Sequence, residues 1–281
     1  MVSIVIVSWN CREYLARCLQ SIQQFISYDH EIIVVDNAST DGTVDFVRTE
    51  FPAVKIIANG SDVGFATASN QGIRLARASF VALLNPDTEL MMEPFLSMIA
   101  MAKSDSSIAC VAPELLNSDR SHQPSVRQLP RLADQVIVML KLRPFFKWLS
   151  VMRRYTREPK NTGQPIDVEQ VMGAAMLIPR VALESVGLLD EAYPNWFEEV
   201  DWCARARRLG QRIMFDPRSK IIHYGGVSFQ QILTIKKQRW FLAGLARYAK
   251  KNWSKKDQVV VKCVTPISLA LSYLQLLIKP R

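Results

Sequence analysis

The sequence lacks the short motifs that would assign a nucleotide-binding fold directly. No Gly-x-Gly-x-x-Gly fingerprint follows the first apolar segment, and no Gly-Lys-Ser or Gly-Lys-Thr phosphate loop is present. The missing fingerprint disfavours a Rossmann oxidoreductase. If a nucleotide binds here, we expect a metal ion rather than a glycine-rich loop to hold its phosphates. The chain also contains no internal repeat.

Cysteines are few and fit neither a disulfide framework nor a zinc site. Their number is odd, they are scattered, and no Cys-x-x-Cys pair occurs, which is typical of a protein in a reducing compartment. Residues 1–7 lack a basic leader and a small-residue cleavage site, so we expect a strand there rather than a signal peptide. The five cysteines are Cys11, Cys18, Cys110, Cys203 and Cys263.

Acidic residues are outnumbered by basic ones. The 26 Asp and Glu against 35 Lys and Arg give a formal net charge of +9. This balance predicts an anionic partner: a nucleotide, a phospholipid, a phosphorylated acceptor or a nucleic acid. Hydrophobic residues make up 49% of the chain, which excludes a disordered or low-complexity protein.

Apolar runs alternate with segments of helical periodicity through the first part of the chain. Unbroken β-branched and aliphatic runs are typical of strands buried on both faces of a sheet. The alternation predicts a doubly wound α/β fold with a mixed or parallel sheet flanked by helices. The predicted strands are 3–7, 31–36, 54–57, 80–84, 107–113, 168–178, 212–215 and 220–223, and the predicted helices include 12–25, 43–51, 67–78 and 93–102.

Polar side chains follow several of these strands directly. Asn10 follows the first, Asp36 ends the second, and Asn85 and Asp87 follow the strand at 80–84. Because ligands bind at the carboxyl ends of strands in such sheets, we expect these side chains to gather at one edge. A divalent cation that holds a diphosphate needs one or two carboxylate oxygens of this kind.

Seven stretches, in order, resemble the family-2 glycosyltransferases with the GT-A fold, and the rhamnosyltransferase-like branch most. The similarity covers roughly residues 2–250. It implies an inverting sugar transfer from a nucleotide-diphosphate sugar, with Mg²⁺ or Mn²⁺ at the diphosphate. The stretches are 4–10, 34–42, 64–66 with 70–72, 84–87, 172–176, 197–202 and 223–228.

The resemblance also implies roles for individual residues. Asp87 is the expected metal ligand and His223 a second one, although a packed strand-end histidine is the alternative. The catalytic base is expected at Glu199, where the family usually has Asp, with Asp201 and Glu198 as alternatives. The residues expected to bind the nucleotide, or to let it approach the backbone, are Asn10, Asp36, Asp62, Asn70, Asn85 and Gly173.

The segment 127–160 mixes basic residues with aromatic and aliphatic ones. It holds nine Lys or Arg against Asp134 and Glu158. Such a mixture suits an anionic membrane surface, and it equally suits a pair of core-facing helices with a basic solvated side. Nucleic acid is disfavoured because no recognised binding module surrounds the segment.

After a basic helix predicted at 229–253, residues 259–278 contain one charge, Lys262. Their length is close to that of a membrane span, but Pro266 interrupts the run, and Ser268, Ser272 and Gln275 form a polar stripe. We therefore expect a helix that lies in the membrane interface or packs on the catalytic domain. The basic residues that flank it are Lys255, Lys256, Lys279 and Arg281.

The sequence thus predicts a GT-A-type catalytic domain at 1–228 and a basic, apolar helical appendage at 229–281. The expected function is transfer of a sugar, best rhamnose, from a UDP- or dTDP-sugar to a glycan or polyprenyl-linked acceptor. The expected location is cytoplasmic, at the inner face of the plasma membrane. The alternatives are a catalytically inactive sugar-binding subunit and a membrane-surface scaffold.

Overall fold

The computed structural model describes residues 1–157, 163–226, 231, 232 and 234–278. Some predictions reach beyond these residues. Four of them lie partly outside the described residues. They are the end of the basic segment at 158–160, the last residues of the motif at 223–228, the domain boundary at 228/229 with the first residues of the predicted helix, and the flanking charges Lys279 and Arg281.

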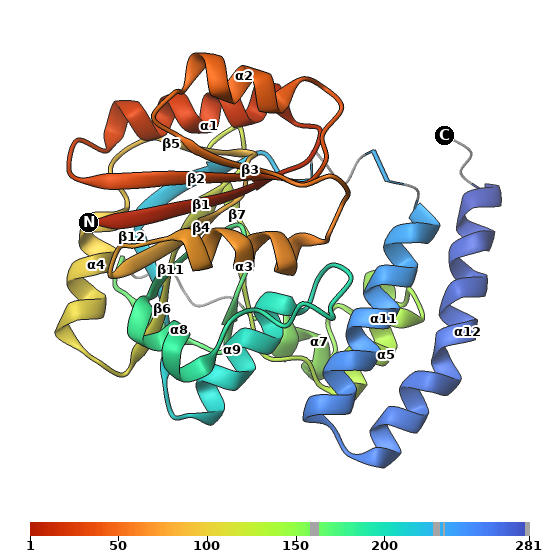
Figure 1. Ribbon diagram of the computed structural model, residues 1–281. Coiled ribbons are helices and arrows are strands. Elements are labelled where there is room, and N and C mark those ends of the chain that lie inside the picture. Colours follow the sequence, from red (N-terminus) through yellow and green to blue (C-terminus); the bar gives the residue numbers. More distant parts are fainter. Residues whose placement is uncertain (158–162, 227–230, 233, 279–281) are drawn as a thin grey trace.

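Within the described part of the chain, ten strands form one mixed sheet (Figure 1). Strands β3, β2, β1 and β4 run parallel in that order, and β11 is antiparallel to both β4 and β6. β8 and β10 pair separately. The strands are β1 (Val2–Ser8), β2 (His30–Asp36), β3 (Lys55–Ala58), β4 (Phe80–Leu84), β5 (Thr88–Leu90), β6 (Ile108–Leu116), β7 (His122–Gln123), β8 (Val126–Arg127), β9 (Ile166–Val168), β10 (Gln170–Val171), β11 (Ala175–Pro179) and β12 (Arg212–His223).

Helices cover both faces of this sheet, as the α/β prediction requires (Figure 1). One face packs against Leu15, Val47 and Met98 of α1, α2 and α4. The other packs against residues of α3, α8 and α9, including the fully buried Trp202. The helices of this layer arrangement are α1 (Arg12–Phe25), α2 (Thr43–Glu50), α3 (Phe65–Leu75), α4 (Phe95–Ser104), α8 (Arg180–Val186) and α9 (Glu198–Arg208).

Strands β1, β2 and β4 end at the same edge of the sheet. Their registers pair Ser8 with Asp36 and Ile6 with Leu84, so the polar residues that follow them start from neighbouring positions. All five residues of β4 are buried, as a strand covered on both faces should be. The backbone N–H of Asn85 donates to the carbonyl of Ala174 at 2.9 Å, which fixes the turn that carries Asp87.

Two strand predictions are wrong in their boundaries. The strand expected at 168–178 is divided among β9, β10 and β11, because Met172 to Ala174 leave the sheet and line a cleft instead. The two short strands expected at 212–215 and 220–223 form one strand, β12, whose register on β6 shifts between Asp216 and Lys220. Pro217 lies within that irregularity, which explains why the sequence suggested a break.

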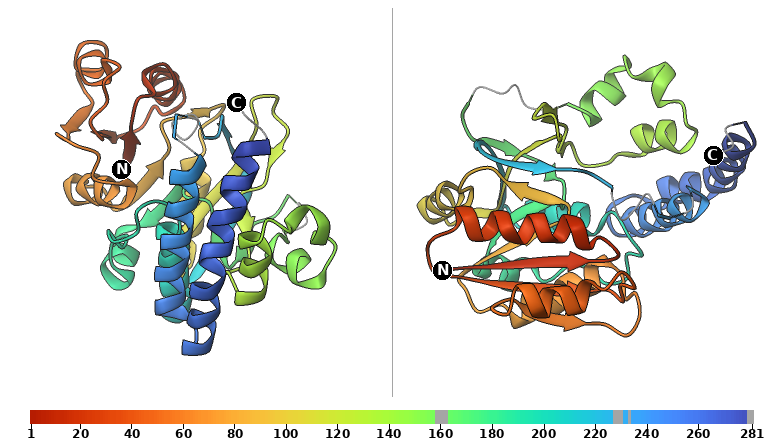
Figure 2. Two further views of the ribbon diagram at one scale, coloured as in Figure 1. Left: turned by 90° about the vertical axis from the view of Figure 1, so that its right-hand side faces the viewer. Right: turned by 90° about the horizontal axis from the view of Figure 1, so that it is seen from above.

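The basic segment and the C-terminal residues form helices on the same side of the molecule (Figure 2). Pro266 does not end α12. A third hydrophobic cluster joins this region to the loop before α9, with Tyr193 and Phe197 packed against Leu245 and Tyr248 of α11. The helices are α5 (Leu132–Met139), α6 (Arg143–Phe146), α7 (Ser150–Tyr155), α11 (Thr234–Asn252) and α12 (Lys255–Ile278).

Gly72 sets the distance between α3 and the sheet. A Cβ added there would lie 2.3 Å from Cγ1 of Val5 and 3.3 Å from Cγ2 of Val35. We expect Gly72→Ala to lower the free energy of unfolding by about 1–2 kcal/mol, because overpacking outweighs the gain in helix propensity. Urea denaturation measures the change. The matched control is Gly60→Ala, whose Cβ meets nothing within 4 Å; equal stabilities for the two variants would contradict the prediction.

Candidate active site

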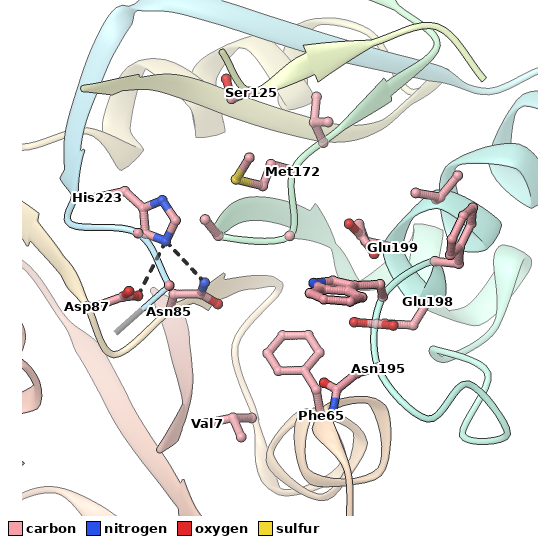
Figure 3. A pocket seen from close by; sticks show the side chains of 18 of the residues that line it. Val7, Phe65, Asn85, Asp87, Ser125, Met172, Asn195, Glu198, Glu199 and His223 are labelled. Carbon is pink, nitrogen blue, oxygen red and sulfur yellow. Dashed lines mark hydrogen bonds and ion pairs between the residues drawn. The ribbon is translucent and has the colours of Figure 1, made fainter. Parts of the chain in front are cut away.

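A cleft of about 660 Å³ opens at the carboxyl edge of the strands (Figure 3). This volume suits a ligand of the size of a nucleotide sugar. The walls of the cleft come from the ends of β1 and β4, the segment 171–174, the loop 195–199 and α11. Seven of the predicted site residues line it: Asp62, Asn85, Asp87, Gly173, Glu198, Glu199 and His223.

Asp87 and His223 face each other on one wall of the cleft. His223 ends β12, pairs with Thr88 of β5, and brings its Nε2 to 3.3 Å from Oδ1 of Asp87. Asn85 Nδ2 lies 3.4 Å from the same nitrogen. Both Asp87 and His223 are 6% exposed. The predicted pairing of these two residues is therefore present in the fold, although they lie far apart in the sequence.

Gln123 determines which nitrogen of His223 carries a proton. Its Nε2 donates to the carbonyl of His223 and to Oδ1 of Asn117, both at 3.0 Å. These two bonds orient the amide so that Oε1 lies 2.7 Å from Nδ1 of His223. An oxygen in that place accepts a hydrogen bond from the N–H at Nδ1, which leaves the lone pair of Nε2 directed at Asp87.

This arrangement fits a divalent cation. Two adjacent ligands at about 2.1 Å from an octahedral ion lie about 3 Å apart, close to the observed separation of Oδ1 and Nε2. Among the described residues no group of three or more His, Cys, Asp or Glu could hold a metal. A cation at this pair would therefore take its remaining ligands from phosphate oxygens and water, as Mg²⁺ does in many phosphate sites.

Glu198 and Glu199 lie on the opposite wall, at the first residues of α9 (Figure 3). Burial raises the pKa of Glu199, and the charge of Arg127 and nearby backbone N–H groups oppose that rise. Burial also raises the pKa of Glu198, and the charge of Glu199 adds to it. The Oε2 atom of each is buried without a hydrogen bond. A carboxylate in such surroundings is a stronger base than one in water.

Gly173 lies against Glu199. A Cβ at Gly173 would be 3.5 Å from Cβ and Cγ of Glu199 and 3.8 Å from its Cδ. The backbone of Gly173 thus lies close to the side chain of Glu199, which leaves that side chain little room to move. This contact was not foreseen from the sequence, which suggested a ligand against the backbone.

The loop before α9 has a strained backbone. Trp196 and Phe197 both have positive φ, 63° and 73°, which bulky side chains rarely adopt. Helix α11 holds the loop in place at Gly244, where a Cβ would lie 3.0 Å from Cδ2 of Phe197 and 3.1 Å from the Trp196 carbonyl oxygen. Strain of this kind persists only where the surrounding packing imposes it. Here it sets the starting point of α9 and so the position of Glu199.

Asp201 lies outside the cleft lining. It is 0% exposed and accepts from Arg205 Nε at 2.9 Å, Lys251 Nζ at 2.6 Å and Tyr193 OH at 3.3 Å. These contacts tie α9 to α11. Trp202 points into the core and donates to the carbonyl of Gly187, whereas Trp196 lines the cleft.

The remaining predicted nucleotide residues divide into two groups. Asp62, in the cleft, accepts from Asn37 Nδ2 at 2.7 Å, and Asn37 also lines the cleft. Asp36, just outside the lining, has a buried Oδ2 without a hydrogen bond. Asn10 and Asn70 are outside the lining, where Asn10 accepts from the backbone of Thr40 and Asn70 binds Leu189 and Glu191.

Sequence analysis missed several residues of the cleft. Gln123 has no signal of its own, since its role depends on a histidine 100 residues away. Arg127 was counted only as one of many basic residues. Trp240 and Phe241 belong to the helix that was treated as an appendage, yet they line the cleft. Asn37 stood inside one of the quoted stretches without a role.

The mixed sheet flanked by helices, with Asp87 and His223 at one edge, agrees with the predicted GT-A glycosyltransferase fold. Residues 3–177 match the model of glycosyl transferase family 2. The chain belongs to this family. The predicted family and fold are therefore confirmed.

Curated relatives include two bacterial rhamnosyltransferases. The N-acetylglucosaminyl-diphospho-decaprenol L-rhamnosyltransferase of Mycobacterium tuberculosis is 25% identical over 234 residues, which are 79% of this chain and 75% of the relative. Rhamnosyltransferase WbbL of Escherichia coli K12 is 25% identical over 259 residues, 88% of this chain and 92% of the relative. The likeness to the rhamnosyltransferase branch thus extends over most of each chain.

Two solved structures have the same fold. GalNAc-T7 with UDP, GalNAc and Mn²⁺ aligns with a TM-score of 0.59 at 18% identity, over 79% of this chain and 43% of that one. Mannosyltransferase PcManGT of Pyrobaculum calidifontis with GDP-Man and Mn²⁺ aligns with a TM-score of 0.58 at 15% identity, over 100% of this chain and 76% of that one. At these identities the comparison supports the fold alone.

The buried network of Asp201 predicts a structural effect. We expect Asp201→Asn to lower the free energy of unfolding by about 3 kcal/mol, because it removes the buried charge that pairs with Arg205 and Lys251 and leaves Arg205 without a carboxylate partner. The matched control is Asp45→Asn in the exposed pair with Arg48, expected to change stability by less than about 0.5 kcal/mol. Chemical denaturation compares them. A stable Asp201→Asn variant with a large loss of turnover would instead assign the base role to Asp201.

Proposed function

We propose that this protein is an inverting, metal-dependent glycosyltransferase, with a UDP- or dTDP-sugar as donor and rhamnose as the best candidate sugar. One observation carries the proposal: the Asp87–His223 pair and the buried carboxylate of Glu199 face each other across a single cleft. A cation site and a base on opposite sides are what an in-line displacement at a sugar carbon requires.

The donor lies along the strand-end wall in this proposal. Asp36, Asn37 and Asp62 bind the base and ribose, and the diphosphate lies at Asp87 and His223. A bound Mg²⁺ or Mn²⁺ would supply neutralisation of the charge that develops on the leaving diphosphate. The Mn²⁺ named with GalNAc-T7 and with the mannosyltransferase supports this choice of cofactor.

Glu199 is the proposed general base. Its carboxylate accepts the proton of the acceptor hydroxyl as that oxygen attacks the anomeric carbon, and the bond from this carbon to the diphosphate oxygen breaks. Gly173 restricts the Glu199 side chain, and the buried Oε2 of that side chain is shielded from solvent. Glu198 is the second candidate because its Oε2 is also buried without a hydrogen bond, but its carboxylate lies on the Asn195 side of the wall (Figure 3).

The acceptor is proposed to be a glycan, carried on a polyprenyl diphosphate. The diphospho-decaprenol in the name of the mycobacterial relative supports a lipid-linked acceptor. Trp196, Trp240 and Phe241 offer aromatic faces on which a sugar could stack, and Arg127 offers a cation for a phosphate. We place the protein in the cytoplasm, against the inner face of the plasma membrane, where such an acceptor and a nucleotide sugar would meet.

Replacement of the proposed base separates catalysis from binding. We expect Glu199→Gln to lower kcat about 10²–10⁴-fold, a barrier increase of about 3–5 kcal/mol, with donor affinity unchanged. In the parent protein kcat/KM should fall as pH drops through the raised pKa of Glu199, because only the ionised form accepts a proton. Steady-state kinetics against pH measures both effects.

Glu198→Gln is the matched control, since it also removes a buried carboxylate from the cleft. A larger loss of kcat in Glu198→Gln than in Glu199→Gln would assign the role of general base to Glu198. The alternative is an inactive sugar-binding subunit. It would be supported if the parent protein bound nucleotide normally but transferred no sugar, and if neither variant changed that binding.

Calorimetry tests the metal site. We expect dTDP or UDP to bind with Mn²⁺ and to lose that affinity about 100-fold in EDTA or in His223→Ala. His122→Ala is the control, because His122 contacts Glu114 at 2.9 Å outside the cleft lining. A nucleotide signal independent of Mn²⁺ would refute metal dependence. No nucleotide signal at all would leave the membrane-surface scaffold as the function.

A further inference from the structure

Helix α12 buries Val261 in the ordinary way, but further along it turns serines inward and large apolar side chains outward. Ser268 and Ser272 face the protein and are 0% and 1% exposed. Val259, Ile267 and Leu274 face outward and are 58%, 50% and 52% exposed. A surface helix in water normally turns its apolar stripe to the core and its polar side to solvent.

Specific hydrogen bonds fix this orientation. Ser268 Oγ donates to the carbonyl of Met139 at 2.7 Å and accepts from Gln238 Nε2 at 3.0 Å. Ser272 Oγ donates to the carbonyl of Ser268 at 2.9 Å. A rotation that buried the apolar side would break the bonds to α5 and α11. The outward direction of the apolar side chains is therefore a property of the fold.

A second apolar group lies on the neighbouring insert. Phe145 and Trp148 are 70% and 65% exposed, at and just after α6. Lys141, in the turn between α5 and α6, donates to Gln238 of α11 at 2.6 Å, so this insert is fastened to the helix that packs against α12. Figure 2 shows α12 and the helices of the insert on the same side of the molecule. We call α12 together with residues 143–148 the outer helical face.

The outer helical face is strongly basic, and Asp257, which bonds Ser254 at the start of α12, is its one acidic residue. No acidic residue occurs at 143–157 or at 258–278. Exposed basic residues accompany the apolar ones: Arg143, Lys147, Lys255, Lys256 and Lys262. Exposed apolar side chains accompanied by basic ones are complementary to an anionic bilayer, where hydrocarbon takes the apolar side chains and headgroups take the cations.

We propose that the outer helical face docks on an anionic phospholipid bilayer, with α12 lying in the interface plane. Residues 255–276 are long and apolar enough to cross a membrane by length and composition. A span is nevertheless disfavoured, because α12 packs against α5 and α11, and α11 carries Lys236, Lys237 and Arg239. These charges would have to enter the hydrocarbon with it.

This docking places the bilayer one helix away from the cleft. Helix α11 lies between α12 and the rest of the molecule (Figure 1), and its residues Trp240 and Phe241 line the cleft. One consequence of the docking rests on the proposed function: a lipid-linked acceptor would reach Glu199 along α11. The docking itself requires no catalytic activity.

Vesicle flotation tests the docking. The full chain is mixed with vesicles of phosphatidylcholine alone or with about 30% phosphatidylglycerol, and we expect binding to the second kind that weakens as salt is raised. Ile267→Glu, Leu274→Glu and Trp148→Glu should each lower the bound fraction about tenfold. Val181→Glu and Leu209→Glu are matched controls, because these residues are 66% and 57% exposed on α8 and after α9, and both should bind like the parent.

Three results would overturn the proposal. The first is a flotation result: the parent chain does not float with anionic vesicles, or all variants float to the same extent as the parent. The second is resistance of the membrane-bound protein to carbonate extraction, which would show a span. The third is a concentration-dependent dimer that Leu274→Glu abolishes without any vesicle binding, which would show that a second copy covers the face. Metal-dependent dTDP binding is measured in every variant, and its loss would indicate failure of the fold or of the proposed function instead.

Discussion

The active-site geometry depends on the attachment of α11 to the N-terminal turn of α9. Lys251 binds both Asp190 and Asp201, and Arg247 binds Asp190 at 2.7 Å. Burial alone would raise the pKa of Asp190, but the hydrogen bonds from Arg247 and Lys251 hold it well below its ordinary value. These charged contacts, with the close approach at Gly244, maintain the positive φ of Trp196 and Phe197. Without them the loop could relax, and the carboxylate of Glu199 would lose its place opposite Asp87.

The fold gives the acidic residues different roles through their surroundings. Asp201 is buried with two cations and a tyrosine, and it contributes to stability. Glu198 and Glu199 are held beside the cleft with a buried oxygen that has no hydrogen bond, an arrangement that costs stability and favours reactivity. Asp87 faces a histidine whose proton is held on the other side by Gln123. Glu198 and Asp201 are three residues apart in the sequence, yet Asp201 has cationic partners and the Oε2 of Glu198 has no hydrogen bond.

The C-terminal helices serve two surfaces at once. One side of α11 contributes Trp240 and Phe241 to the cleft, and another packs on α12, whose apolar side chains face outward. The residues first considered an appendage therefore complete the site. The sequence predicted a polar stripe at Ser268, Ser272 and Gln275; in the structure the two serines are buried and Gln275 is exposed. Only the three-dimensional contacts show that Ser268 and Ser272 face inward, toward the carbonyl of Met139 and the amide of Gln238.

The sequence by itself determined the α/β alternation, the buried strand at 80–84 and its termination at Asp87, and the family, because apolar periodicity and turn residues act between near neighbours in the chain. It did not determine that 212–223 is one strand, that Asp201 faces α11, or that Gln123 orients His223. Those outcomes depend on contacts between residues up to 100 or more positions apart. Such contacts decide which side of a helix is buried and which carboxylate is paired, and no local pattern encodes them.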